Sequence, residues 1–329
     1  MKPVQIDVHY STQHMGQIQV YRRCQNSFQR RGIDLRFQPD RFPDLKSDAD
    51  VLILQADFAG PNPENLSQRI IIEERADSSM PQARWLLGKD NVSMCFKVSV
   101  AQRKWLNLPV KRVHCWLLDS LLDWPERTIL TEDQIAKVRP GFHFGMYPRL
   151  ARRVDRARKL GRVNDWRGRP IDVIFIGNTQ YSNATICRHR LAFCDTLQKI
   201  NGIRILCIPR HIVSSSKYFE ISRNAKIVVS PWGYGELSYR DFEALLDHCV
   251  LVKPRTDFVE VLGEPLCMDS YTPCQPDASD LEDCISRILG PSDEAAFERR
   301  QRSCNQILEW WDEERIVDWW CRETEITAC

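Results

Sequence analysis

The sequence predicts an α/β fold with a parallel β-sheet in each half of the chain. The first observation is a set of short, nearly continuous apolar runs in the C-terminal half, at 172–176, 203–208, 226–229 and 249–252. The second is a helical periodicity between these runs, over 187–200, 216–225 and 238–248. Apolar strands that alternate with helices are typical of βαβ units, whose parallel sheets are buried on both faces. The third observation is that the N-terminal half repeats this rhythm less regularly.

The individual elements follow from the same patterns. In the N-terminal half we expect strands at 4–10, 33–37, 51–54 and 113–118, helices at 17–31 and around 64–76, and a turn at 57–63. In the C-terminal half, Phe242, Leu245, Leu246 and Cys249 follow the i, i+3, i+4, i+7 spacing of one helix face. This stripe predicts that the helix at 238–248 packs on the sheet.

The length of 329 residues suits two domains. Because the stretch 149–169 contains no long apolar run, we expect it to join an N-terminal Rossmann-like domain (1–148) to a C-terminal one (170–290). A helical tail (291–329) would pack back on the body. Open parallel sheets bind ligands at the carboxyl ends of their strands, so this organisation predicts a cleft between the two domains.

The charge is balanced overall but uneven along the chain. Lys and Arg number 46 against 44 Asp and Glu, a net charge of +2, which argues against a strongly basic nucleic-acid-binding protein. The connection 149–169 holds nine basic and two acidic residues, whereas 277–329 holds six basic and fourteen acidic ones. We interpret the connection as a solvated helix, with docking to a membrane surface as the second choice and nucleic-acid binding as a third. The acidic, Trp-rich tail would cross back toward this connection or the first domain.

Thirteen cysteines are scattered without any C-x-x-C pair, and the N-terminus has no apolar secretory segment. No apolar run approaches the roughly 18 residues of a transmembrane helix. These features predict a cytoplasmic protein with reduced, mostly buried thiols, and the inner face of a membrane is the alternative location.

The segment 230–253 carries the most informative motif. Gly233 and Gly235 occupy a loop after an apolar strand, and Ser238 is a good N-cap, with Asp241 three positions on in the manner of a capping box. The N-terminus of the following helix offers free N–H groups and a positive dipole end, which suit a diphosphate, and Arg240 could add a bidentate contact. An ordinary strand-to-helix turn is the alternative interpretation. Such a turn alone does not explain why several charged side chains, including Glu236 and Glu243, lie close together in this segment.

This segment resembles the donor-binding motif of GT-B glycosyltransferases, especially the bacterial spore-maturation and exostosin-like group. The shared pattern is Gly-x-Gly-Glu…Tyr-Arg-x-Phe-Glu-Ala…Gly-Cys-x-Leu, and the resemblance covers about 170–254. It implies two facing Rossmann-like domains and transfer of a sugar from a nucleotide-diphosphate sugar to an acceptor hydroxyl, in cell-surface glycan or glycoconjugate synthesis. Glu243 would bind the ribose hydroxyls, and Glu236 would lie near the sugar and the diphosphate.

The chain departs from the pattern at two positions. Glu236 and Glu243 are seven positions apart, whereas the best-known retaining motif has eight. His248 stands where the family usually has glycine. The first departure leaves the role of Glu236, and retention or inversion at the anomeric carbon, open.

Further donor-side candidates follow other predicted strands or belong to the motif itself: Gly177, Asn178, Arg210, Tyr234, Tyr239 and Lys253. A plain strand-end turn is the alternative for Gly177, and a solvated surface position is the alternative for Arg210 and Lys253.

On the acceptor side, His9, His14 and Gly16 flank the first predicted turn between a strand and a helix. A histidine there could act as general base, because its pKa lies near neutral pH. His14 is our candidate, a structural contact is its alternative, and Asp57 and Asp119 are alternative bases.

We expect no metal and no other cofactor. The sequence Asp48-Ala49-Asp50 matches the metal-binding D-x-D of the other large glycosyltransferase fold, but it stands before its strand rather than after it. The expected partners are a nucleotide-diphosphate sugar and a glycan, lipid-linked or protein acceptor, without nucleic acid. The base, the sugar, the acceptor and the oligomeric state stay open. The alternative functions are a catalytically silent nucleotide-sugar-binding module and a sugar-nucleotide epimerase of similar build.

Overall fold

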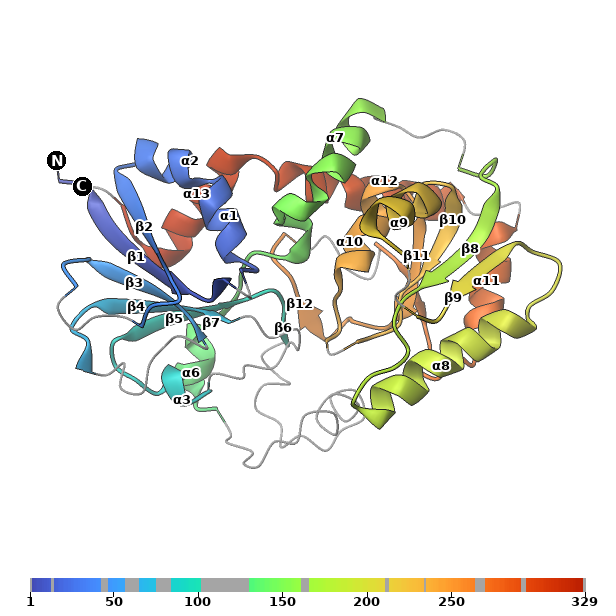
Figure 1. Ribbon diagram of the computed structural model, residues 1–329, viewed down its shortest axis with the longest axis horizontal. Coiled ribbons are helices and arrows are strands. Elements are labelled where there is room, and N and C mark those ends of the chain that lie inside the picture. Colours follow the sequence, from blue (N-terminus) through green and yellow to red (C-terminus); the bar gives the residue numbers. More distant parts are fainter. Residues whose placement is uncertain are drawn as a thin grey trace.

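The structure is a computed structural model that contains two parallel β-sheets side by side (Figure 1). It describes residues 2–12, 15–42, 47–56, 65–74, 84–101, 130–160, 166–210, 213–233, 235–263, 270–290 and 294–327. The predicted α/β class, with one sheet in each half of the chain, is confirmed.

The first sheet has the strand order β2-β1-β3-β4-β5-β7, with all neighbours parallel. Its strands are β1 (Val4–Tyr10), β2 (Ile33–Pro39), β3 (Val51–Gln55), β4 (Arg69–Glu74), β5 (Val92–Lys97) and β7 (Val138–Pro140). The helices of this half are α1 (Ile18–Arg23), α2 (Gln25–Arg30), α3 (Arg84–Leu87) and α6 (Glu132–Lys137). The single helix expected over 17–31 is therefore divided at Cys24.

The helix expected around 64–76 was wrong, because β4 occupies most of this stretch. Ile70, Ile71 and Ile72 are 0% exposed and lie between β3 and β5, so both faces of the strand are buried. Three successive β-branched residues favour such a strand over a helix. The strand expected at 113–118 and the turn at 57–63 lie outside the described residues.

The second sheet has the order β13-β11-β10-β8-β9 and is also parallel. Its strands are β8 (Ile171–Ile176), β9 (Ile205–Ile208), β10 (Ala225–Val229), β11 (Val250–Pro254) and β13 (Thr272–Cys274). Its helices are α8 (Ala184–Lys199), α9 (Ser215–Ser222), α10 (Tyr239–Leu246) and α11 (Leu281–Leu289). Phe242, Leu245, Leu246 and Cys249 are all buried in one core cluster, as the stripe predicted.

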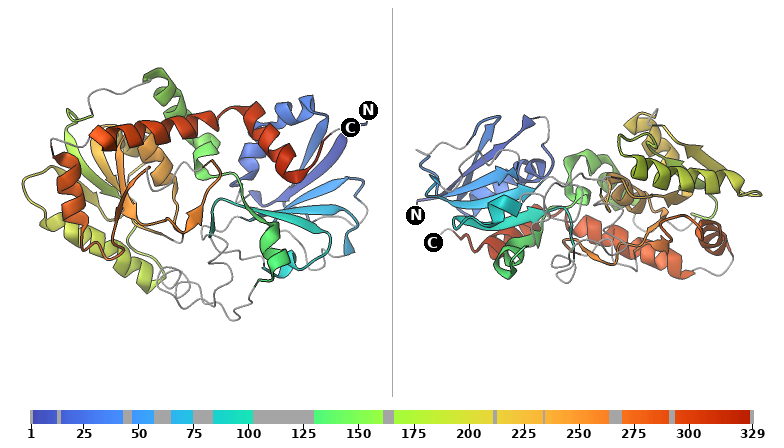
Figure 2. Two further views of the ribbon diagram at one scale, coloured as in Figure 1. Left: turned by 180° about the vertical axis from the view of Figure 1, so that it is seen from behind. Right: turned by 90° about the horizontal axis from the view of Figure 1, so that it is seen from below.

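Three sets of elements connect the halves. The short strands β6 (Val100–Ala101) and β12 (Val259–Glu260) pair antiparallel between them. The 3₁₀ turns η4 (Phe144–Met146) and η5 (Pro148–Leu150) lead from the first half into α7 (Ala151–Leu160). The C-terminal helices α12 (Glu294–Glu309) and α13 (Glu313–Thr324) run from the second half to the first (Figure 2, red).

Helix α13 packs its tryptophans on the first half. Trp320 donates a hydrogen bond from Nε1 to the Tyr21 hydroxyl at 2.8 Å and meets Phe28 edge to face. Glu314 also forms ion pairs with Arg30 and Arg31. The acidic tail is thus paired with one arginine on α2 and one at the end of that helix.

The ten cysteines in the described ranges are free thiols, and eight of them are buried. Among the helices that the structure describes, none combines the length and the apolar character needed to cross a membrane.

Candidate functional site

A cavity of about 450 Å³ lies at the carboxyl ends of β8 and β10 in the second sheet, with side chains from the connection on one side. Seven residues predicted to bind the donor line it: Asn178, Gly233, Gly235, Ser238, Tyr239, Arg240 and Glu243. Phe144 of η4 and Arg149 of η5 also line the cavity.

The N-terminus of α10 opens on this cavity, and its cap has the predicted form. Ser238 is the N-cap, and its N–H donates to Oδ2 of Asp241 at 2.9 Å. The other carboxylate oxygen of Asp241 accepts a hydrogen bond of 2.6 Å from the Ser230 hydroxyl. Lys253 Nζ lies 2.7 Å from Oδ2 and compensates the buried charge. Asp241 therefore fixes where the strand-end loop meets the helix.

Two guanidinium groups converge at Gly177, just after β8. A Cβ atom on this glycine would lie 2.5 Å from both Arg190 Nη2 and Arg240 Nη1. The missing side chain is thus what lets both cations approach the end of the strand. Arg240 also lies over the Tyr218 ring, 5.2 Å from its centroid.

Arg190 comes from α8 and was not among the residues predicted from the sequence. Burial, followed by the repulsion of Arg240, lowers its pKa to about 10, with Tyr181 opposing the change, so it stays charged at neutral pH. A signal was available, because Arg190 lies on the helix face of Ile186, Phe193 and Leu197, all buried. A charged residue on an apolar stripe needs a buried partner or a ligand.

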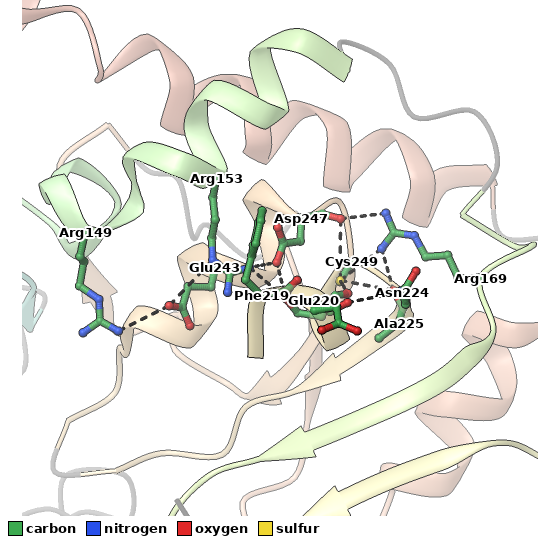
Figure 3. A network of polar contacts seen from close by, with 11 residues as sticks. Arg149, Arg153, Arg169, Phe219, Glu220, Asn224, Ala225, Glu243, Asp247 and Cys249 are labelled. Atoms are coloured by element: carbon green, nitrogen blue, oxygen red, sulfur yellow. Dashed lines mark hydrogen bonds and ion pairs between the residues drawn. The ribbon is translucent and has the colours of Figure 1, made fainter. Parts of the chain in front are cut away.

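Glu243 lines the cavity, and its carboxylate faces arginines of the connection 149–169 (Figure 3). Its Oε1 is 3.5 Å from Nη2 of Arg149 and 4.0 Å from Nε of Arg153. Arg149 stacks on Tyr239, 3.8 Å from the ring centroid. The carboxylate is therefore held at the cavity wall by cations of the connection.

The interpretation of the connection as a solvated helix needs correction. Arg153 is buried, forms an ion pair with Asp247 and donates to the Ser222 hydroxyl at 2.9 Å. Arg169 is buried too and donates to the backbone oxygens of Ala225 and Asp247 at 2.7 and 2.8 Å (Figure 3). These contacts anchor the connection to the second half, while other basic side chains of α7, such as Arg158, stay exposed.

Some predicted donor residues lie elsewhere. Lys253 is 0% exposed and is bound by Asp241 and by the Glu236 backbone oxygen at 2.8 Å, so it supports the cap rather than lining the cavity. Glu236 is 2% exposed and is not part of the cavity lining, although its neighbours Gly235 and Leu237 are. Arg210 is exposed beyond β9. Tyr234 lies outside the described residues.

The acceptor-side candidates are mostly outside the described ranges, namely His14, Asp57 and Asp119. His9 is buried and its Nδ1 bonds the backbone oxygen of Arg41 at 3.0 Å. Burial lowers the pKa of His9, with the Arg41 hydrogen bond opposing the change. Its described contact is therefore a structural one.

The D-x-D carboxylates are used within the first half. Asp48 forms an ion pair of 2.8 Å with Arg36, and Asp50 accepts from the Gln5 N–H at 2.8 Å.

The second departure from the pattern, His248, falls where the backbone conformation favours glycine. His248 has φ = 55°, the left-handed conformation in which glycine often ends a helix. The histidine therefore adopts a backbone conformation that non-glycine residues seldom take.

The hydroxyl of Tyr218 adds a polar group to the cavity wall. It is buried and has no hydrogen-bond partner in the part of the chain that the structure describes. Burial raises the pKa of Tyr218, so it remains a neutral donor and acceptor. The cavity thus combines three arginines, one carboxylate and three tyrosines, a set that suits an anionic ligand with hydroxyl groups.

No family model and no curated protein matches the chain. Among solved structures, a glycosyltransferase from Rickettsia africae ESF-5 is similar with a TM-score of 0.51 and 8% identity, over 99% of this chain and 100% of that one. An alpha-glucosyltransferase in complex with UDP-glucose and DNA containing an abasic site has a TM-score of 0.46 and 11% identity, over 97% and 98%. Trehalose-6-phosphate from E. coli bound with UDP-2-fluoro glucose has a TM-score of 0.49 and 11% identity, over 86% and 75%. The first similarity shows a shared fold, and the predicted GT-B arrangement of two Rossmann-like halves is confirmed.

Proposed function

We propose that the chain is a glycosyltransferase that moves a sugar from a nucleoside-diphosphate sugar to an acceptor hydroxyl. The observation that carries this proposal is the convergence of Arg190 and Arg240 at Gly177, in the same cavity as Glu243 and the N-terminus of α10. Cations and a carboxylate in one cavity suit a nucleoside diphosphate, whose phosphates are anionic and whose ribose carries hydroxyls. The motif of 230–253 supports a place near the spore-maturation and exostosin-like group.

In this proposal the diphosphate lies between the two arginines and the positive dipole end at the N-terminus of α10. These groups stabilise the negative charge that develops on the leaving diphosphate when the bond to the sugar breaks. Glu243 accepts hydrogen bonds from the ribose hydroxyls, and its ion pairs with Arg149 and Arg153 orient its carboxylate. Closure of the two halves over the donor would exclude water and limit hydrolysis.

We further propose that the reaction needs no metal, because the cations of the cavity neutralise the diphosphate. Three arginines and one glutamate give the lining a net charge of +2. The acceptor is proposed to be a hydroxyl of a glycan, a lipid-linked sugar or a protein, in glycan synthesis at the cytoplasmic side.

The test is isothermal titration with UDP, GDP and ADP, each with and without EDTA, followed by an assay for donor hydrolysis and transfer. We expect one nucleoside diphosphate to bind in EDTA and its sugar conjugate to release that diphosphate. Binding without turnover over a broad donor and acceptor panel would favour the silent module, and an isomerised sugar nucleotide would favour the epimerase. Failure of all three diphosphates to bind would reject the proposal.

A pair of variants checks the placement of the donor. Glu243→Ala should weaken nucleotide binding about 10-fold or more, since hydrogen bonds to a charged group contribute about 1.5–3 kcal/mol. Glu220→Ala is the matched control, because Glu220 is an exposed carboxylate on α9 that pairs with Lys217. Equal affinity of Glu243→Ala and wild type would rule out this orientation of the donor.

A further inference from the structure

Two consecutive residues of α8 hold both backbone polar groups of Trp232, in the loop after β10. His189 Nε2 accepts a hydrogen bond of 3.1 Å from the Trp232 N–H. Arg190 Nη1 donates to the Trp232 oxygen at 3.0 Å and to the Pro231 oxygen at 2.9 Å. This loop is therefore fixed to α8 by side chains rather than by strand pairing.

His189 also ties the loop to a third segment. Its Nδ1–H donates to the Pro276 oxygen at 2.7 Å, which sets the tautomer that leaves Nε2 as an acceptor. The ring is 6% exposed and stacks on the Trp232 indole at 5.6 Å. Burial, opposed by the hydrogen bond to Pro276, lowers the pKa of His189 to about 4, so the ring is neutral and both bonds persist at neutral pH.

The consequence is a guanidinium group whose Nη2 has no hydrogen bond to the residues that the structure describes. Arg190 Nε donates to the Asn178 oxygen at 2.6 Å, and Nη1 is used by the two loop carbonyls. Nη2 is the group that remains, and it lies next to Gly177 at the cavity. Arg240, in contrast, lies over Tyr218, and its Nε has no hydrogen-bond partner within the described ranges. Arg190 is thus held in place before any ligand binds, and Arg240 is held less.

We propose that Arg190 is the fixed phosphate-binding cation of the cavity and that His189 is its positioning residue, acting through the Trp232 backbone. The ligand chemistry is a phosphate of a nucleoside diphosphate, so the inference rests on the proposed function. A fixed guanidinium binds a phosphate without losing conformational freedom, whereas a mobile one must be ordered at the moment of binding. Arg190 would therefore contribute the larger share of the phosphate affinity.

The experiment measures affinity for the best-binding nucleoside diphosphate and for the matching unphosphorylated nucleoside. Titration calorimetry serves the diphosphate, and ligand-observed NMR serves the weakly binding nucleoside. Arg190→Lys keeps the charge but cannot reproduce the fork of three hydrogen bonds. We expect the dissociation constant for the diphosphate to rise about 10- to 100-fold and that for the nucleoside to change less than about twofold.

His189→Gln is the second, independent variant. A glutamine can form one of the two hydrogen bonds of the His189 ring, to Pro276 or to Trp232, but does not reproduce the ring geometry. We expect a rise of about 3- to 10-fold for the diphosphate, again without loss of nucleoside affinity. Arg188→Lys is the control, since Arg188 is an exposed neighbour on the same helix. Thermal unfolding of each variant shows that it is folded at the temperature of the titration.

The outcomes separate the two hypotheses. If wild type binds no nucleoside diphosphate, the proposed function fails and this inference with it. If wild type binds but folded Arg190→Lys binds the diphosphate equally well, Arg190 is not the phosphate cation. If His189→Gln loses diphosphate and nucleoside affinity to the same degree, or loses neither, His189 has no positioning role. If one variant does not fold, the other variant still tests the role of the residue that it replaces.

Discussion

Replacing Gly177 by alanine should weaken nucleotide binding while leaving the fold intact. A Cβ atom at this position would lie 2.5 Å from Arg190 Nη2 and from Arg240 Nη1, about 1 Å closer than an ordinary contact of about 3.5 Å. Both guanidinium ends would have to move away from the cavity end. Arg190 is bound by three backbone oxygens, so most of the movement should fall on Arg240.

The magnitude follows from the bonds that this shift removes. A hydrogen bond to a charged group contributes about 1.5–3 kcal/mol, and a factor of ten in affinity corresponds to about 1.4 kcal/mol. Losing one arginine–phosphate bond should therefore raise the dissociation constant for a nucleoside diphosphate about 10- to 100-fold. The free energy of unfolding should change by less than about 1 kcal/mol, because the glycine has no positive φ and the displaced atoms are side-chain ends.

The assay is titration calorimetry with the nucleoside diphosphate, together with thermal unfolding. Gly233→Ala is the matched control in the same cavity, since its Cβ would meet the Tyr181 hydroxyl at 3.7 Å and Arg190 Nη1 at 3.9 Å, both ordinary contacts. We expect this comparison variant to weaken binding less than Gly177→Ala does, because its Cβ displaces neither guanidinium group. If Gly177→Ala keeps wild-type affinity, or if both alanine variants weaken it equally, Arg240 does not bind the phosphates at Gly177.

Three further predictions concern stability. Burial raises the pKa of Glu73 to about 8, against the hydrogen bond from Tyr21, so the acid is protonated in the folded state. The stability that protonated Glu73 contributes is complete below the unfolded pKa and is lost as pH rises toward about 8. In urea unfolding, the free energy of unfolding of wild type should therefore fall relative to that of Glu73→Gln by up to about 4 kcal/mol between about pH 5 and about pH 8. Parallel pH curves for the two proteins would contradict this prediction. Lys253→Met should cost about 3–5 kcal/mol in chemical denaturation because it leaves Asp241 charged and buried, and a loss below about 1 kcal/mol would show that Asp241 needs no counter-charge. Trp320→Phe should cost about 1–3 kcal/mol, since the Tyr21 hydroxyl loses its indole donor; unchanged stability would mean that this bond contributes nothing.

The second sheet could be predicted from the sequence because its strands are short apolar runs bounded by turns. The run at 172–176 corresponds to β8 (Ile171–Ile176), and that at 226–229 to β10 (Ala225–Val229). β4 was missed because its three isoleucines are flanked by charged residues, a composition that also suits a helix. Its pairing with β3 and β5 decides the matter, and those contacts join residues well apart in the chain.

The candidate site divides in the same way. Ser238, Asp241 and Glu243 belong to one turn and one helix, so local spacing was enough to single them out. Arg190 and Tyr218 come from α8 and α9, and only the packing of these helices on the sheet brings them to the cavity. Lys253 was assigned to the cavity because it follows an apolar run. Lys253 instead forms an ion pair with Asp241, the acidic residue of the capping box of α10.

The crossing of the C-terminal helices sets an order on biosynthesis. Tyr21 and Trp320 are 299 residues apart, yet they share a hydrogen bond inside the first half. A ribosome finishes β1 to β7 long before it makes α13, so Tyr21 and Phe28 stay without the indole of Trp320 until then. Part of the aromatic core of the first half therefore stays exposed on the nascent chain until α13 is made. A stalled or shortened chain would present that surface to chaperones and proteases.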